Sequence, residues 1–387
     1  MYVIVEGLFI LLPFFEPNYF KKIYLIHLVY TLWRVLSIVC IGCKCINKDV
    51  KKYMFPMLSF VCFFVCQIFS TYYNNGNYFS EFKADLYILA PCLYISLLFD
   101  DYQREVINVL SIIMGIILLI QALTIFIFPN GLYVESIYNR YPYWFWDSAG
   151  HMSSLAFVYT VVLKIADLLY GGKYKIYMTV HIILYMFLFG IYFKDYGNLF
   201  GFIIVAAGCL APMFWKKFKF DNAFIWWLVI LLLNIGLIGF NIQNYFAGII
   251  ENVFRKELTL SGRTYIWQSA ISVIKSHFWI GKGDAARFGY AGWCFINGRA
   301  YAAHNQLLQI FVNGGLVSLI AILLVELNVV VSICKCENVE LRTVLSMALM
   351  GCGVTMLNDT FTPLLPLFIL FLFALNIKKL LQINYKQ

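Results

Sequence analysis

Long apolar runs separated by short polar segments make up almost the entire chain. A transmembrane helix needs about 20 mostly apolar residues, and runs of roughly that length recur about twelve times. We predict spans at about 2–15, 23–43, 53–70, 84–99, 106–128, 150–170, 176–193, 197–215, 223–240, 304–333, 343–361 and 363–381. The first is short and contains Glu6, but it lacks the basic flank and cleavage site of a signal peptide. The pattern predicts an all-α integral membrane protein with about twelve transmembrane helices in a single polytopic domain, residues 1–387.

One polar interruption stands apart, residues 241–303 between the ninth and tenth predicted spans. Loops of this length in a compact protein usually have a function. Within it, Ile266, Ala270 and Ile274 recur at helical spacing, which predicts a surface helix that ends in a turn at Gly281 and Gly283. Basic residues outnumber acidic ones, with Arg255, Lys256, Arg263, Lys275, Lys282, Arg287 and Arg299 against Glu251, Glu257 and Asp284. Such a loop favours an anionic ligand.

Composition agrees with a membrane protein, because 62% of residues are hydrophobic and 13% are charged. Lys and Arg are retained on the cytoplasmic side of short loops, and fifteen of them fall on one side if the N-terminus is inside. We therefore predict that both termini are cytoplasmic and that residues 241–303 form an extracytoplasmic loop. This asymmetry accounts for most of the net charge of +9, so no nucleic-acid partner is expected.

The cysteines suggest neither a disulfide in the loop nor a metal site. Only Cys294 of the eleven cysteines lies in the outer loop, where it has no partner for a disulfide. The Cys-x-Cys pairs at Cys43/Cys45 and Cys334/Cys336 lack a second pair or a His at zinc spacing. No metal is therefore predicted.

Two further expectations concern residues at the edges and within the spans. Most Tyr and Trp residues, including those of the segment 141–146, are interpreted as belts at the membrane interfaces. Glu6 and Arg34 both fall inside spans, where an unpaired charge is costly. We predict that they pair with each other.

His304 lies where the chain re-enters the membrane after the long loop. It precedes a predicted helix whose N-terminus favours negative charge, and Gly314-Gly315 within that helix would allow close packing. A His in this position can remove a proton from a hydroxyl near neutral pH. A hydrogen-bonded packing role is the alternative.

The order and spacing of these motifs resemble the O-antigen ligase and polymerase family of bacterial cell-surface polysaccharide synthesis. The resemblance covers about residues 261–316: a Ser-Gly-Arg-x-x-x-Trp segment from Ser261, the Gly-x-Gly turn, and His-Asn followed by a glycine pair. It implies a membrane glycosyltransferase of GT-C-like fold, without metal or other cofactor. Members transfer a glycan from a polyprenyl (undecaprenyl) diphosphate carrier to an acceptor sugar hydroxyl at the outer face of the bacterial cytoplasmic membrane.

The resemblance also implies roles for individual residues. Arg263 matches the arginine assigned to the diphosphate, and His304 matches the histidine assigned to acceptor activation. Without a divalent ion, only cationic and amide groups can stabilise the leaving diphosphate. Further candidates for substrate binding are Arg140, Lys194, Trp267, Asn305, Arg287 and Arg299.

The chain departs from the family pattern in two places. The second arginine expected at the outer end of the eighth span is replaced by Lys194, which cannot bind a phosphate bidentately. Phe278 stands where a proline is common, which affects only the turn. Arg140 either meets the diphosphate or pairs with Asp147 at the surface, His151 lies in the same outer segment, and His277 packs in the loop helix. Asp359 either lines the acceptor cleft or caps a helix.

Within the family, we predict a polymerase of lipid-linked repeat units, for lipopolysaccharide O-antigen, capsule or exopolysaccharide. The alternatives are an O-antigen ligase that transfers the glycan to lipid A core, and a flippase or other transporter of lipid-linked oligosaccharides. A transporter should show internal repeats and charges along its spans. Expected partners are the lipid-linked oligosaccharide, the acceptor glycan and the bilayer, with a flippase and a chain-length regulator of the same pathway.

Overall fold

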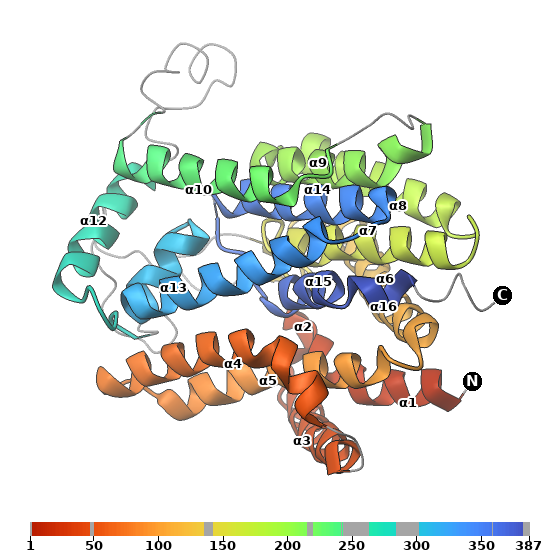
Figure 1. Ribbon diagram of the computed structural model, residues 1–387, viewed down its shortest axis with the longest axis horizontal. Helices are drawn as coiled ribbons and strands as arrows, with labels where there is room; N and C mark the ends of the chain where they lie inside the picture. The colour runs from red at the N-terminus through yellow and green to blue at the C-terminus, as the bar shows by residue number, and fades with distance from the viewer. Residues whose placement is uncertain are drawn as a thin grey trace.

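The protein is a bundle of α-helices with one short β-hairpin, as the computed structural model in Figure 1 shows. The structure describes residues 2–46, 50–134, 142–214, 220–240, 242, 263–283, 302–357 and 359–381. The elements are α1 (Tyr2–Leu11), η1 (Leu12–Phe15), α2 (Asn18–Lys21), α3 (Tyr24–Ile46), α4 (Val50–Tyr73), α5 (Tyr78–Leu98), α6 (Gln103–Ile127), β1 (Tyr133–Val134), β2 (Pro142–Tyr143), α7 (Met152–Leu169), α8 (Lys175–Phe187), η2 (Leu188–Tyr192), α9 (Tyr196–Phe214), α10 (Ala223–Gly239), α12 (Arg263–Ser276), α13 (Gln306–Cys334), α14 (Val339–Met356), α15 (Leu365–Leu375) and α16 (Ile377–Leu381).

The predicted all-α membrane fold class is confirmed. Seven helices of the described part are long and apolar enough to cross a membrane: α3, α6, α7, α8 with η2, α9, α13 and α14. Shorter apolar helices cover Tyr2–Phe15, Met57–Tyr73, Ala223–Gly239 and Leu365–Leu375. The count of twelve spans and the position of the long loop stay predictions.

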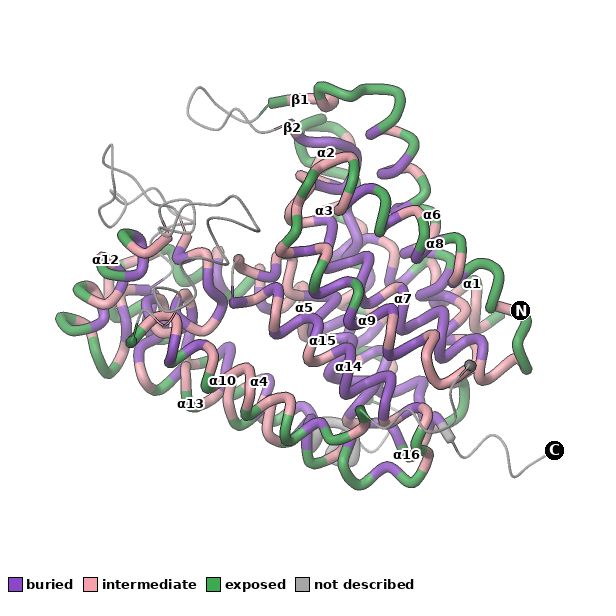
Figure 2. The backbone as a smooth tube through the Cα atoms, turned by 90° about the horizontal axis from the view of Figure 1, so that it is seen from above, coloured by how far each residue is buried: buried purple, intermediate pink, exposed green. Residues whose placement is uncertain are grey.

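The core of the bundle surrounds α15, in which every residue from Leu365 to Ala374 is buried. Figure 2 shows the same burial along α7 and α14 beside it. α9 and α14 approach backbone to backbone, because a Cβ on Gly201 would lie 2.6 Å from the Gly351 carbonyl oxygen, and one on Gly351 would lie 2.5 Å from that of Gly201. Small residues allow this kind of helix contact in membranes, where van der Waals packing drives association.

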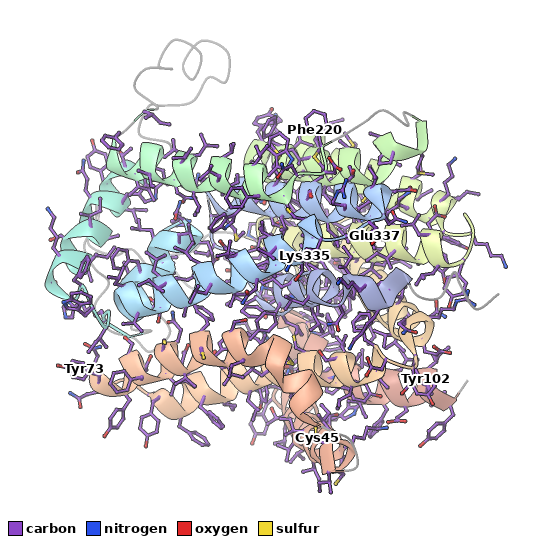
Figure 3. All side chains as sticks on the ribbon, in the orientation of Figure 1. Cys45, Tyr73, Tyr102, Phe220, Lys335 and Glu337 are labelled. Atoms are coloured by element: carbon purple, nitrogen blue, oxygen red, sulfur yellow. The ribbon has the colours of Figure 1, made fainter. Side chains whose placement is uncertain are left out.

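Charged residues pair at one end of the bundle, the end predicted to face the cytoplasm. The ion pairs there are Lys44–Glu6, Asp100–Lys379, Lys164–Glu340 and Asp221–Arg342. Tyr102, at the start of α6, lies at this end, whereas Tyr73, at the end of α4, lies on the side of α12 (Figure 3). These four ion pairs therefore lie on the side opposite α12.

The predicted pair between Glu6 and Arg34 is wrong. Arg34 instead binds Glu16 and donates to the Pro13 carbonyl at 2.8 Å, while Glu6 accepts from Lys44 at 2.5 Å. α1 and α3 are antiparallel, so the start of α1 faces the end of α3, and the segment after η1 faces its first half. The partners follow from this antiparallel register, which the sequence pattern does not reveal.

The interpretation of segment 141–146 as an interfacial belt is also wrong for its two tryptophans. Trp144 and Trp146 are 1% and 4% exposed. The Trp144 indole N–H donates to the Phe128 carbonyl at 2.8 Å, and the Trp146 backbone N–H donates to Gln121 Oε1 at 2.6 Å. The Trp144 ring packs edge-on against Phe193, with centroids 5.1 Å apart, and Trp146 lines a cavity inside the protein.

The turn that follows α12 hydrogen-bonds to α13 at the point where α13 is not helical. Gly315 is non-helical (φ 67°, ψ −167°), so the carbonyls of Val312 and Asn313 lose the N–H groups four residues ahead. Those carbonyls accept instead from Lys282 and Gly283, both at 2.8 Å. In exchange, the freed N–H groups of residues 316 and 317 donate to the carbonyls of residues 278 and 279, at 2.8 and 3.3 Å. All four backbone groups at the break are thereby satisfied.

Substitution Gly281→Ala is expected to detach this turn and to lower the midpoint of thermal unfolding. Gly281 has φ +79°, and an added Cβ would lie 2.4 Å from the Asn313 carbonyl oxygen. A left-handed non-glycine residue costs about 1–3 kcal/mol, and the clash adds to that cost. Gly171→Ala is the matched control, since Gly171 has φ +64° with no atom within 4 Å. Equal thermal shifts in the two variants would mean that the contact between the turn and α13 contributes nothing.

Candidate functional site

His304 and Asp359 form a polar pair at the end of the bundle where α12 lies. The imidazole Nδ1 lies 3.1 Å from Asp359 Oδ1, with side chains that are 40% and 27% exposed. His304 has a left-handed backbone, φ 47°, which is uncommon for a residue with a Cβ and often marks a functional position. When His304 is neutral, Nδ1–H donates to the carboxylate and Nε2 keeps its lone pair.

Asp359 is surrounded by positive groups. Burial alone would raise the pKa of this carboxyl, but the hydrogen bond from His304 and the charges of His304, Arg263 and His151 together hold its pKa below the ordinary value. The carboxylate also accepts from the Thr360 backbone N–H at 2.8 Å. Asp359 is therefore ionised throughout the neutral range. It contacts both His304 and the following turn, while helix α15 begins after Leu364 without a side-chain cap, and a place for Asp359 in an acceptor cleft stays a prediction.

Arg263 reaches this cluster because α12 is fixed against α13. Ile266, Ala270 and Ile274 on α12 are buried with residues 308 and 312 on α13, as their spacing predicts. The Trp267 indole N–H donates to the Ala303 carbonyl at 3.0 Å. Arg263 is the first residue of α12, and its charge acts on Asp359. The structure thus brings together the two residues predicted to be catalytic.

Asn305, predicted to bind substrate, is fully buried beside His304. Its Oδ1 accepts from the Leu308 N–H at 3.0 Å and so caps α13. Its Nδ2 donates to Asn234 Oδ1 at 2.8 Å and to the Leu357 carbonyl at 3.2 Å. These contacts fix the backbone immediately after His304, and a substrate contact by Asn305 or by the buried Trp267 stays a prediction.

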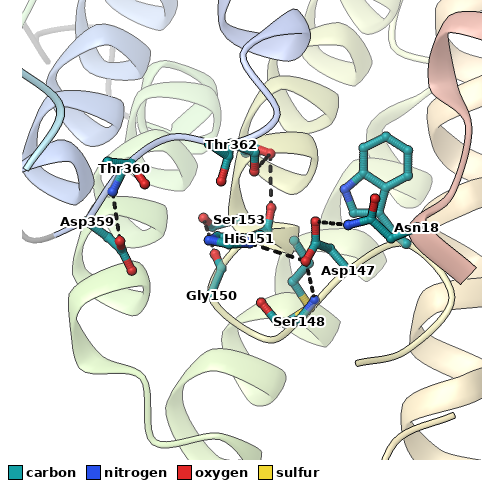
Figure 4. Close-up of polar contacts among 12 residues, drawn as sticks. Asn18, Asp147, Ser148, Gly150, His151, Ser153, Asp359, Thr360 and Thr362 are labelled. Carbon is teal, nitrogen blue, oxygen red and sulfur yellow. Dashed lines mark hydrogen bonds and ion pairs between the residues drawn. The ribbon is translucent and has the colours of Figure 1, made fainter. Parts of the chain in front are cut away.

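A second His–carboxylate pair lies close to the first. His151 Nδ1 is 3.2 Å from Asp147 Oδ1, and Asn18 Nδ2 donates to the other oxygen of Asp147 at 2.5 Å (Figure 4). Asp147 is 5% exposed, and Arg140, its alternative partner, lies outside the described residues. Spacing of four residues is the sequence signal that could have identified the His151–Asp147 pair, since i and i+4 side chains meet on one helical turn.

The remaining predicted residues fall outside this cluster or outside the described ranges. Lys194 is exposed and has a left-handed backbone, φ 55°. It follows the π-helical turn η2 and precedes Asp195, which accepts from Asn198 Nδ2 at 2.7 Å. Asn198 in turn donates to the Gly150 carbonyl at 3.3 Å, beside His151. Arg140, Arg287 and Arg299 lie outside the described residues.

A cavity of about 970 Å³ adjoins the two His–carboxylate pairs. Its lining includes His151, Gln306 and Thr360 beside the pairs, and it extends to residues of α3 and α5. Within the described ranges, no group of three or more His, Cys, Asp or Glu side chains is arranged to hold a metal ion. The His304 imidazole, the Asp359 carboxylate and the charge of Arg263 thus act on one another next to this cavity, which Gln306 and Thr360 help to line.

Part of the chain matches a known protein family. Residues 182–323, somewhat more than a third of the chain, match the family model described as O-antigen ligase. The matched stretch runs from α8 into α13 and includes both Arg263 and His304. No curated protein matches the chain. Members of the matched family are membrane glycosyltransferase-like enzymes, and the family implies a lipid-linked glycan substrate.

Proposed function

Because the chain belongs to the O-antigen ligase and polymerase family, we propose that it polymerises lipid-linked oligosaccharide repeat units. The donor is a glycan on a polyprenyl diphosphate, and the acceptor is a sugar hydroxyl of a second lipid-linked unit. The observation that supports this proposal most strongly is the pairing of His304 with Asp359 under the charge of Arg263. These groups supply a base and a cation for one transfer.

The transfer proceeds as one displacement at the anomeric carbon of the donor sugar. His304 Nε2 takes the proton of the acceptor hydroxyl as its oxygen forms the new glycosidic bond. The bond from the anomeric carbon to the diphosphate oxygen breaks, and its electron pair leaves with the diphosphate. Arg263 stabilises the developing negative charge, and Asp359 stabilises the imidazolium. Afterwards His304 returns its proton to solvent.

The decisive experiment supplies purified protein with a lipid-linked repeat unit, with and without lipid A core, and separates the products on a gel. A ladder from the repeat unit alone is expected for the polymerase. The same reaction with EDTA should form the same ladder, because cationic side chains replace a divalent ion. Product only with the core would indicate a ligase, and product in neither tube would favour a transporter. Loss with EDTA and recovery with Mg²⁺ or Mn²⁺ would exclude the metal-free mechanism.

The proposal places the reaction at the outer face of the bacterial cytoplasmic membrane, with both termini cytoplasmic. A thiol reagent that cannot cross the membrane should then label Cys294 in intact cells, in variants that keep one cysteine each. It should spare Cys43 and Cys334, which are exposed on the protein surface at the opposite end. Permeabilised cells serve as the control, since Cys43 and Cys334 should react there. Labelling of Cys334 in intact cells would reverse the topology.

A further inference from the structure

The cavity beside His304 and Asp359 extends to a polar wall on α5 and α3. Glu81 and Asp85 lie one helical turn apart on α5, each 5% exposed, and both line the cavity. Glu16 and Arg34, which bind each other, line it as well. Glu16, Glu81 and Asp85 lie at or next to helix ends predicted to face outward, and Arg34 lies deeper, within α3. The wall is therefore on the same side of the membrane as the proposed reaction.

Charges around the cavity are balanced. Its lining contains four carboxylates and four Lys or Arg side chains: Glu16, Glu81, Asp85, Asp147, Lys21, Lys22, Arg34 and Lys83. A diphosphate would meet as much repulsion as attraction here, unlike at the basic end near Arg263. A sugar hydroxyl, by contrast, donates one hydrogen bond and accepts others. A wall that contains both acceptors and donors therefore suits a neutral polyhydroxylated ligand.

The size and the rings of the cavity fit an oligosaccharide. Ligand sites commonly measure about 300–1,000 Å³, and the cavity, at about 970 Å³, is at the upper end of that range. Tyr87, Tyr133, Tyr143 and Trp146 contribute to its lining. Aromatic rings of this kind offer a flat apolar face together with a polar edge, which matches the C–H faces and hydroxyl edges of sugar rings.

A row of amide side chains connects this cavity to His304. Gln306, Gln309 and Asn313 line the cavity at helical spacing on α13. Gln309 Nε2 donates to Asn313 Oδ1 at 2.8 Å, and Gln306 Oε1 accepts from the Phe361 N–H at 2.8 Å. His304 stands two residues before the first of them. A glycan bound along this row would have one end beside the His304 imidazole.

We propose that this cavity is the acceptor subsite, that it binds the neutral end of a glycan, and that Glu81 and Asp85 select the acceptor by accepting hydrogen bonds from its hydroxyls. The inference rests on the proposed glycosyl transfer and adds the substrate class of this subsite. The diphosphate of the donor stays at the basic end with Arg263. The diphosphate of the donor and the neutral sugars of the acceptor thus occupy different regions.

Kinetic constants of Glu81→Gln and Asp85→Asn test this assignment. Each change keeps the shape of the side chain but removes the charge and turns one acceptor atom into a donor. Loss of a hydrogen bond to a charged group commonly costs tenfold or more in binding. With the repeat-unit oligosaccharide released from its carrier as the varied acceptor and the lipid-linked unit as the donor, we expect the KM for the acceptor to rise about tenfold in each variant, with the KM for the donor and the kcat within about threefold of wild type. Glu105→Gln, at the opposite end of the bundle, is the matched control and should change none of these constants.

A second measurement needs no variant. The host's repeat-unit oligosaccharide, released from its lipid carrier and fitted with a photoreactive diazirine, should cross-link wild-type protein within Tyr78–Leu98. An unchanged acceptor KM in both variants, or a cross-link that lies elsewhere, would overturn the subsite while polymer formation by wild-type protein continues. A rise in the donor KM instead would assign the cavity to the donor. Failure of wild-type protein to form any product would reject the proposed function itself.

Discussion

Arg263→Ala is expected to reduce the rate of polymer formation about a hundredfold or more in protein that is inserted at normal levels. The guanidinium would bind a diphosphate whose charge grows as the bond to sugar breaks, and such a contact is worth roughly 3 kcal/mol in the transition state. Arg263→Lys should restore little, since one ammonium cannot bind two phosphate oxygens in parallel. The measurement is the initial rate with purified lipid-linked repeat unit.

His304→Ala should lower the same rate by about 10² to 10⁴, the usual range for a general base, while the lipid-linked donor still binds. The two variants test different parts of the mechanism. Arg263→Ala removes the stabilisation of the leaving diphosphate, and His304→Ala removes the proton transfer from the acceptor hydroxyl.

Two neighbouring residues provide matched controls for these variants. Lys275→Ala removes an exposed cation at the other end of α12. His277→Ala removes an imidazole that hydrogen-bonds within its own segment, at Ser276 Oγ (2.9 Å) and the Val273 carbonyl (3.3 Å). Both should stay near the wild-type rate. If Arg263→Ala and His304→Ala also did so, the assignment of the site would be wrong and His304 would be a packed residue before a helix cap.

The sequence predicts the elements of this protein better than their mutual contacts. Hydropathy alone indicates the helices, because a membrane requires long apolar segments whatever their neighbours are. Helical spacing of Ile266, Ala270 and Ile274 likewise predicts the buried face of α12. Pairings depend on register between distant segments, and no local pattern encodes it. That is why Glu6 and Arg34 were matched wrongly while Glu16, the actual partner of Arg34, went unnoticed.

In the candidate site, too, the sequence predicts some residues but not their contacts. Arg263 and His304 follow from the motifs. Asp359, whose carboxylate contacts His304, lies 55 residues beyond it and belongs to no motif. Only the fold brings Asp359 to 3.1 Å from the imidazole. The break of α13 at Gly315 is likewise predicted only in part. Gly314-Gly315 predicts close packing, but the exchange of four backbone hydrogen bonds with the turn after α12 depends on a positive φ that glycine permits and does not require.

Asp359→Asn is expected to lower kcat by about 10² to 10⁴ while the KM for the donor changes little. The wild-type carboxylate can only accept, so it holds neutral His304 with the proton on Nδ1 and leaves Nε2 free to act as the base. An amide at that position can donate to Nδ1 and favour the opposite tautomer, in which Nε2 carries the proton. An Asp→Asn change beside a catalytic histidine has an effect of this size in serine proteases, where the histidine takes the wrong tautomer.

The Asp359 carboxyl does not titrate in the neutral range. Its pKa is below the ordinary value of about 4, so the wild-type carboxylate is ionised between about pH 6 and pH 8, and its titration should not change the activity there. The stability that the ionised carboxylate contributes is present above its ordinary pKa and is lost only as the pH falls through the lowered one. Asp101→Asn, an exposed carboxylate at the other end of the bundle, should retain wild-type kcat. A folded Asp359→Asn protein with a near-normal kcat at pH 7 would show that His304 acts without an orienting carboxylate.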